Sequence, residues 1–139
     1  MRTADHNDAK IILDLYELRR EPVMRQARSF WMKFQPKSYS EVKPLLSFDL
    51  PENTFFRQVS SYWEMAASFV NRQILHPQLF ADNCGEGLFV YAKVEPFLKE
   101  IRSHYHPGFM MQMENAVRDH REIGDKLSRI REILKGKSL

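Results

Sequence analysis

The sequence predicts an all-α protein, a single-domain helical bundle of about five main helices over residues 1–139. Apolar residues recur at helical spacing in several long segments, and no alternation of apolar and polar residues is long enough for a β-strand. The chain has only 5 Gly and 7 Pro, which is unlike an all-β or low-complexity protein. Its 43% hydrophobic and 28% charged residues fit one soluble domain of this length.

The stretch from Asn53 to about Arg72 is predicted to be the central helix of the bundle. Two adjoining apolar stripes run along it, so that other helices must cover most of its circumference. The two stripes contain Phe55, Val59, Tyr62, Ala66 and Phe69, and Phe56, Trp63, Ala67 and Val70. Pro51 marks the end of the preceding loop, and Asn53 is the expected N-cap because its side-chain oxygen can accept a backbone N–H.

Two helices are expected before the central one. The first runs from about Ala4 to Arg19, with Thr3 or Asp5 as its cap. The second starts at Pro22, because proline disfavours helical geometry in the residue before it and is well suited to a first helical turn. Apolar residues then recur at helical spacing up to Phe34.

Shorter elements and two further helices complete the prediction. A capping-box pattern opens a short helix over residues 39–46, and a single helical turn follows the central helix at 77–80. A helix over 87–104 contains Pro96, where we expect a kink or a local break. The last helix starts near Phe109, and its apolar spacing stays helical to the end of the chain.

The protein is mildly basic, with a formal net charge of +3, but its charge is unevenly distributed. Between residues 18 and 43, seven bases stand against two acids. The candidate basic surface consists of Arg19, Arg20, Arg25 and Arg28. With Trp31 nearby, such a helix could hold nucleic-acid phosphates. Alternatively, the arginines pair with neighbouring acids, and this interleaving makes binding to an anionic membrane the weaker interpretation.

Glu64 is the polar residue of the central helix that we single out. It lies between Trp63 and Met65, and a carboxylate buried there needs a hydrogen-bond donor or a cation. The candidate cations are Arg25, Arg28 and Arg102. Alternatively, Glu64 points to solvent on a narrow polar face with two serines.

Few residues could form a metal or catalytic site. Glu100, His104 and His106 are close enough in sequence to share a metal, but no Glu-x-x-His pair of the helical-bundle type is present. The single Cys84 could be a nucleophile, although a lone cysteine is more often a small core residue. We therefore assign no catalytic residue, metal ligand or cofactor.

The lone cysteine and the apolar pattern also bear on location. One cysteine cannot form an intramolecular disulfide, and the chain has neither a signal-peptide pattern nor an apolar run long enough to span a bilayer. We expect a cytoplasmic protein without a transmembrane segment.

Two stretches carry a resemblance to a known family. They are RREPVMRQARSFW at 19–31 and FFRQVSSYWEMAASFVNRQILHPQLFADNCGEGLFVYAKVEPFLKEIR at 55–102, about half of the chain together. They resemble a bacterial family of unknown function, in which an arginine-containing helix precedes one centred on an aromatic–Glu pair, here Trp63 and Glu64. The resemblance implies an all-α fold and draws attention to Glu64. Members often carry an N-terminal membrane helix, which this chain does not show.

The sequence favours a helical bundle that acts by protein–protein contact, with a second copy of itself as a homodimer or with another protein. The first alternative is a nucleic-acid-binding or regulatory protein that uses the arginines of the first two helices. The second alternative is a metal-binding protein or an enzyme.

Overall fold

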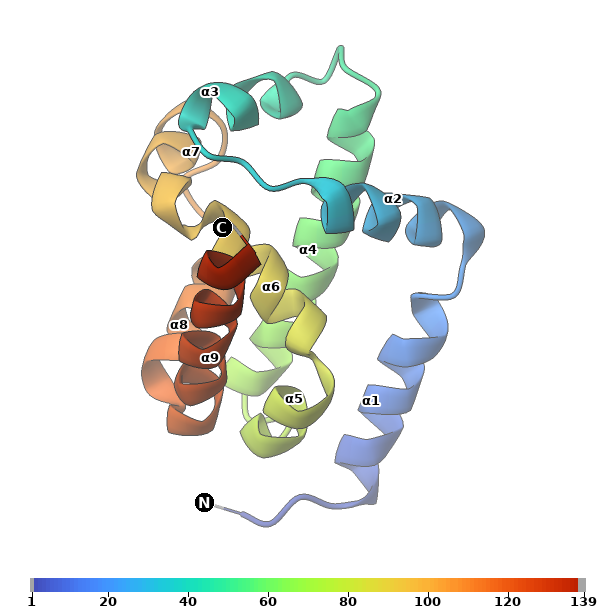
Figure 1. Cartoon of the computed structure of the whole chain (residues 1–139). Helices are drawn as coiled ribbons and strands as arrows, with labels where there is room; N and C mark the ends of the chain where they lie inside the picture. Colours follow the sequence, from blue (N-terminus) through green and yellow to red (C-terminus); the bar gives the residue numbers. More distant parts are fainter. Residues whose placement is uncertain (1, 138–139) are drawn as a thin grey trace.

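The computed structural model describes residues 2–137 and confirms the all-α class: its elements are α-helices joined by turns and short 3₁₀ segments. Five main helices was an undercount, because two of the expected helices are each divided. Figure 1 shows the helices gathered around α4, with α1 at one edge of the molecule. The organisation as a single domain stays a prediction.

The central helix is α4, Glu52–Asn71, within one residue of its predicted bounds. It packs against α2 (Pro22–Lys33) on one side and α8 (Met111–Asp119) on another. Asn53 is not its N-cap, as we had predicted; the cap position is Pro51. Asn53 is buried in the first turn, where its side chain donates to the Leu45 carbonyl (2.7 Å) and accepts from Arg57 Nε (2.7 Å).

Helix α1, His6–Leu18, is capped by Asp5, one of the two predicted candidates. Its carboxylate accepts from two backbone N–H groups of the first turn, and the cap is completed by Asp8. In Figure 1, α1 runs along the outside of the molecule, and it packs against α5 (Pro77–Asn83). The Tyr62 hydroxyl also donates to the Leu15 carbonyl, which ties α1 to α4.

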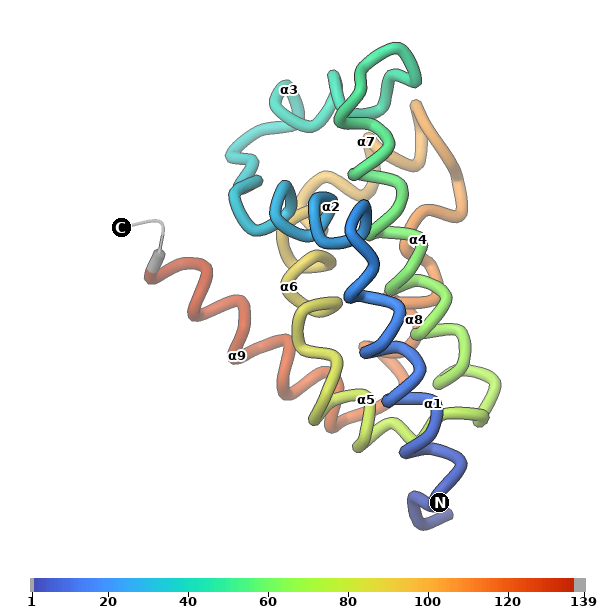
Figure 2. Tube along the Cα trace, turned by 90° about the vertical axis from the view of Figure 1, so that its right-hand side faces the viewer, coloured from blue at the N-terminus to red at the C-terminus, as the bar shows by residue number. Residues whose placement is uncertain are grey.

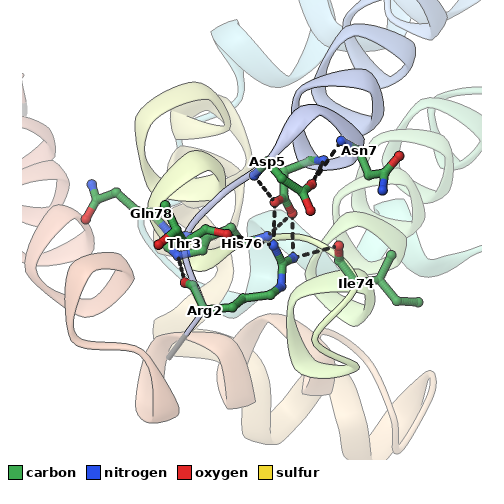
Figure 3. Close-up of polar contacts among 8 residues, drawn as sticks. Arg2, Thr3, Asp5, Asn7, Ile74, His76 and Gln78 are labelled. Atoms are coloured by element: carbon green, nitrogen blue, oxygen red, sulfur yellow. Dashed lines mark hydrogen bonds and ion pairs between the residues drawn. The ribbon is translucent and has the colours of Figure 1, made fainter.

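The segment of chain before α1 is held by the carboxylate of Asp8, which is fully buried. Figure 3 shows Arg2 of this segment beside Ile74 and His76. Both terminal nitrogens of the Arg2 guanidinium donate to it at 2.6 Å, and the His76 backbone N–H donates at 2.8 Å. Arg2 also donates to the Ile74 carbonyl (3.2 Å). We call this cluster the Asp8 latch; it joins residues 2–8 to the turn between α4 and α5.

The predicted capping box at residues 38–41 is not formed. The element it was expected to open is α3, Tyr39–Val42, followed by a 3₁₀ segment, Lys43–Leu46. Ser38 stands at the cap position, but its hydroxyl pairs with that of Ser40 (2.7 Å) and does not cap the helix. Glu41 reaches back to the Lys37 backbone N–H instead.

The break expected at Pro96 is confirmed. Helix α6, Gly85–Val94, ends there, and the 3₁₀ segment Glu95–Phe97 leads into α7, Leu98–His104. Proline cannot donate a backbone hydrogen bond, and its ring clashes with the turn before it. At residues 77–80 we expected one turn, but α5 continues to Asn83.

The uninterrupted last helix was a wrong prediction. The chain forms α8 and then α9, Arg121–Lys137, separated by His120, whose backbone is extended (φ −127°, ψ 111°). Figure 2 shows α9 turning away from α8 and running obliquely past α5 and α6. This turn places Ile123, Leu127 and Ile130 in the core, which a straight continuation would carry away from it.

The aromatic core surrounds α4. Trp31 stacks on Phe56 with ring centroids 5.2 Å apart, and Phe56 stacks on Phe109 at 5.6 Å. Trp63 is fully buried further along α4, with Gly87 of α6 against its ring. Within residues 2–137, none of the helices is both long and apolar enough to cross a lipid bilayer.

Candidate functional site

A stripe of polar side chains follows one face of α4. Its members are spaced three, four and seven residues apart, so they lie on the same side of the helix. They are Arg57, Ser60, Ser61 and Glu64. The stripe lines a cavity of about 270 Å³, whose other wall is the segment 105–110 between α7 and α8. We call this space the α4 cavity.

Glu64 connects the cavity to the start of α8. Its two carboxylate oxygens accept from the backbone N–H groups of Gln112 (2.8 Å) and Met113 (3.0 Å), in the first turn of α8. The first N–H groups of a helix have no partner within the helix, so a carboxylate there is favourable. Burial raises the pKa of Glu64 above its ordinary value, and the bonds from the two amides only partly oppose this shift.

Met110 directly precedes α8 and lines the same cavity. It adopts the left-handed conformation (φ 57°), which is uncommon for a residue other than glycine. Such strained positions persist only where surrounding contacts hold them, and they concentrate at functional sites. Here the contacts are a buried side chain and the cap that Glu64 supplies to the next turn.

Glu64 is therefore bonded, but not to the arginine we expected. Arg28 pairs with Glu86 (2.9 Å), and Arg102 pairs with Glu114 (3.3 Å) while donating to the Phe109 carbonyl (2.8 Å). The donors Glu64 uses belong to a helix start 48 residues further along the chain. Backbone amides carry no side-chain signature, so the sequence offered nothing to identify them.

Replacing Glu64 with alanine should lower the free energy of unfolding by about 1–2 kcal/mol, because two amides of α8 lose their acceptor. Glu64→Gln keeps one carbonyl oxygen and should cost less. Because the pKa of Glu64 is raised in the folded protein, wild type should lose stability relative to Glu64→Gln as the pH rises above about 4. Urea denaturation over a pH series measures both effects; equal costs for the two variants would contradict the cap.

Residues 4–120 match the family model for a domain of unknown function, DUF4760. The chain belongs to this family. This confirms the resemblance to an uncharacterised family, and the match covers most of the chain, more than the half that carried the resemblance. The α4 cavity lies entirely within the DUF4760 domain, whereas α9 begins just after the matched residues. Neither the curated proteins nor the solved structures provide a match to the chain.

The four arginines of the candidate basic surface do not act alike. The Arg19 guanidinium lies over the rings of Tyr16 (5.2 Å) and Trp63 (5.4 Å). Arg28 is held by Glu86, and Arg20 lies 3.4 Å from Glu17. Arg25 is exposed. Three of the four arginines thus have a partner within the fold, which weakens the case for a phosphate-binding surface within this part of the DUF4760 domain.

The candidate metal ligands have separate partners. His104 Nδ1 lies 3.0 Å from the Glu100 carbonyl and 3.2 Å from the Tyr39 hydroxyl. His106 Nδ1 accepts from the Gly108 backbone N–H (2.8 Å). Among residues 2–137, no group of three or more histidine, cysteine or acidic side chains could hold a metal ion. Cys84 is buried, and burial raises the pKa of its thiol to about 12, which disfavours the nucleophilic thiolate.

A second surface is the exposed C-terminal part of α1, residues 13–18, with its turn into α2. Leu13 and Tyr16, three residues apart, share one side of the helix, and Leu18 lies on another. Large apolar side chains are exposed there: Leu13 is 66% exposed, Tyr16 55% and Leu18 57%. Leu18 also lines a shallow hollow together with four charged residues, Glu17, Arg20, Glu21 and Arg25. We call this surface the α1 shoulder.

Proposed function

We propose that this protein acts in the cytoplasm by protein–protein contact through the α1 shoulder, and that its partner is a second copy of the chain. The observation that carries the proposal is the exposure of Leu13, Tyr16 and Leu18, all in the C-terminal part of α1. Single exposed apolar residues are ordinary, but neighbouring ones surrounded by polar groups are typical of interaction sites.

The charges around the shoulder favour a copy of the same surface. Two acids, Glu17 and Glu21, alternate with two bases, Arg20 and Arg25, around Leu18. In a two-fold symmetric dimer each patch contacts itself, so residue i of one protomer meets residue j of the other and the reverse. A surface that carries both acids and bases can pair with its own copy in this way. A uniformly basic patch, as a nucleic-acid partner would require, repels its own copy.

One double variant and one single control variant test the proposal. Native mass spectrometry and size-exclusion chromatography should show a dimer for wild type, and Leu13→Ser with Leu18→Ser should shift it to monomer. Because both side chains are more than half exposed, the folded state should keep its stability. Phe48→Ser is the matched control, since Phe48 is equally exposed but lies in the loop before α4. A monomeric wild type, or a dimer that survives the double variant, contradicts the proposed interface.

A further inference from the structure

The α4 cavity has groups of opposite charge at its two ends. Glu64 lines one end, and Arg57 lines the other, seven residues earlier on α4. At 1.5 Å of rise per residue, their backbones are about 10 Å apart along the helix axis. Ser60 and Ser61 lie between them, and the aromatic side chains of segment 105–110 form the facing wall. The cavity therefore has an acidic end and a basic end.

The acidic end has acceptor capacity left over. A carboxylate has about four acceptor positions, and Glu64 uses two of them for the α8 amides. Within residues 2–137, Glu64 has no ion-pair partner within 4 Å: Arg102 pairs with Glu114, and Arg102 and His106 attract the Glu64 carboxylate only from a longer distance. A half-buried carboxylate without a paired cation keeps part of its desolvation cost. An ammonium group at this end would supply the missing charge.

The basic end is oriented by its neighbours. Arg57 Nε donates to the Asn53 side chain (2.7 Å), and the guanidinium lies over the Phe48 ring at 4.9 Å. Asn53 is one helical turn before Arg57, and Phe48 lies in the loop before α4, whereas Glu64 is two turns after Arg57. The Arg57 guanidinium is therefore directed away from Glu64. Its terminal nitrogens make no hydrogen bond within residues 2–137. A planar guanidinium with two such nitrogens matches a carboxylate in bidentate geometry.

The cavity is small. Its volume is about 270 Å³, and at roughly 30 Å³ per non-hydrogen atom this accommodates about nine atoms. We propose that the α4 cavity binds a small linear zwitterion, with its ammonium group at Glu64, its carboxylate at Arg57, and an apolar stem along the aromatic wall. The two ends bear one charge of each sign, so a ligand with both charges fits better than a plain amine or a plain acid.

Isothermal titration calorimetry of the full chain tests this with three probes of equal stem length: 6-aminohexanoate, hexylamine and hexanoate. The zwitterion should bind at least about tenfold more tightly than either singly charged probe. Equal affinity for hexylamine and 6-aminohexanoate would overturn the assignment of Arg57. If none of the three gives a binding signal at about 10 mM, where even a millimolar dissociation constant is detectable, the site itself is refuted.

Variants locate the binding on the chain. Glu64→Gln should abolish the protein's preference for 6-aminohexanoate over hexanoate. Arg57→Gln should abolish its preference for 6-aminohexanoate over hexylamine. Should Glu64→Gln unfold, Ser61→Phe provides a second test, because Ser61 is exposed and, within residues 2–137, its hydroxyl bonds only to the Gln58 carbonyl (3.4 Å). Ser61→Phe should fill the cavity and weaken binding at least about tenfold. Thr54 is exposed on α4 but outside the cavity, so Thr54→Phe should leave the binding affinity unchanged. Equal effects of the two substitutions on affinity would overturn the placement of the ligand in the α4 cavity.

Discussion

Replacing Asp8 with alanine is expected to lower the free energy of unfolding by about 2–3 kcal/mol, the largest effect we predict for one polar side chain. The carboxylate is fully buried and accepts from Arg2, from the His76 backbone and from the cap of α1. Its removal leaves these donors without their acceptor. Arg2 is partly exposed and can bind water again after the substitution. The loss of stability should therefore be at the low end of the range for buried ion pairs that lose one partner.

Asp14→Ala is the matched control for this variant. Asp14 is on the same helix and lies 3.5 Å from Lys10, but its side chain is 66% exposed. Exposed ion pairs contribute little, so the control should change stability by less than about 0.5 kcal/mol. Guanidinium chloride titrations of both variants give the comparison. Similar losses for Asp8→Ala and Asp14→Ala would show that the latch does not stabilise the fold.

The Asp8 latch also predicts a pH dependence. The hydrogen bonds from Arg2 hold the pKa of the Asp8 carboxyl well below its usual range, more strongly than burial raises it. A depressed folded-state pKa gives stability that is fully present above the unfolded value, about 4, and is lost as the pH falls below it. The stability difference between wild type and Asp8→Asn should therefore be constant near neutral pH and shrink in acid.

Gly87→Ala is expected to destabilise the protein by about 2 kcal/mol, although alanine is normally the better helix former. A Cβ atom at position 87 would lie 2.7 Å from the Trp63 ring, well inside van der Waals contact. Trp63 is fully buried, so its ring cannot move aside without repacking its neighbours. The overpacking cost therefore exceeds the gain in helix propensity.

Gly136→Ala is the opposite case and serves as its control. Gly136 lies in the last turn of α9, and a Cβ atom there would meet no atom of residues 2–137 within 4 Å. The same substitution should then be neutral or raise stability by up to about 1 kcal/mol. Thermal unfolding of the two variants gives the sign directly. A stabilised Gly87→Ala would mean that the ring of Trp63 has more room than the structure gives it.

The parts of the fold that follow from local sequence could be predicted. The apolar stripes placed α4 within one residue, Pro96 divided the helix that contains it, and Asp5 capped α1. Each of these depends on residues close together in the chain. The break at His120 could not be predicted in this way, because the apolar spacing remains helical across it and the extended residue is set by packing of α9 on α5 and α6.

The candidate site shows the same division. Glu64 could be singled out, because a carboxylate is conspicuous among apolar neighbours on a central helix. Its partners could not, since they are backbone amides of α8. The Asp8 latch was also missed: Asp8 meets a backbone N–H from His76, 68 positions away, and no spacing rule links the two. Long-range polar contacts of this kind depend on the completed tertiary fold.

The position of α9 has a consequence for where this protein can be cut. The family match ends at residue 120, yet α9 begins at Arg121 and contributes Ile123, Leu127 and Ile130 to the core. Burying three such side chains contributes on the order of 5 kcal/mol, comparable to the whole stability of a small domain. The end of the family match is thus not the end of the folded unit. A fragment that ends at His120 would expose to solvent the apolar surface that α9 now covers.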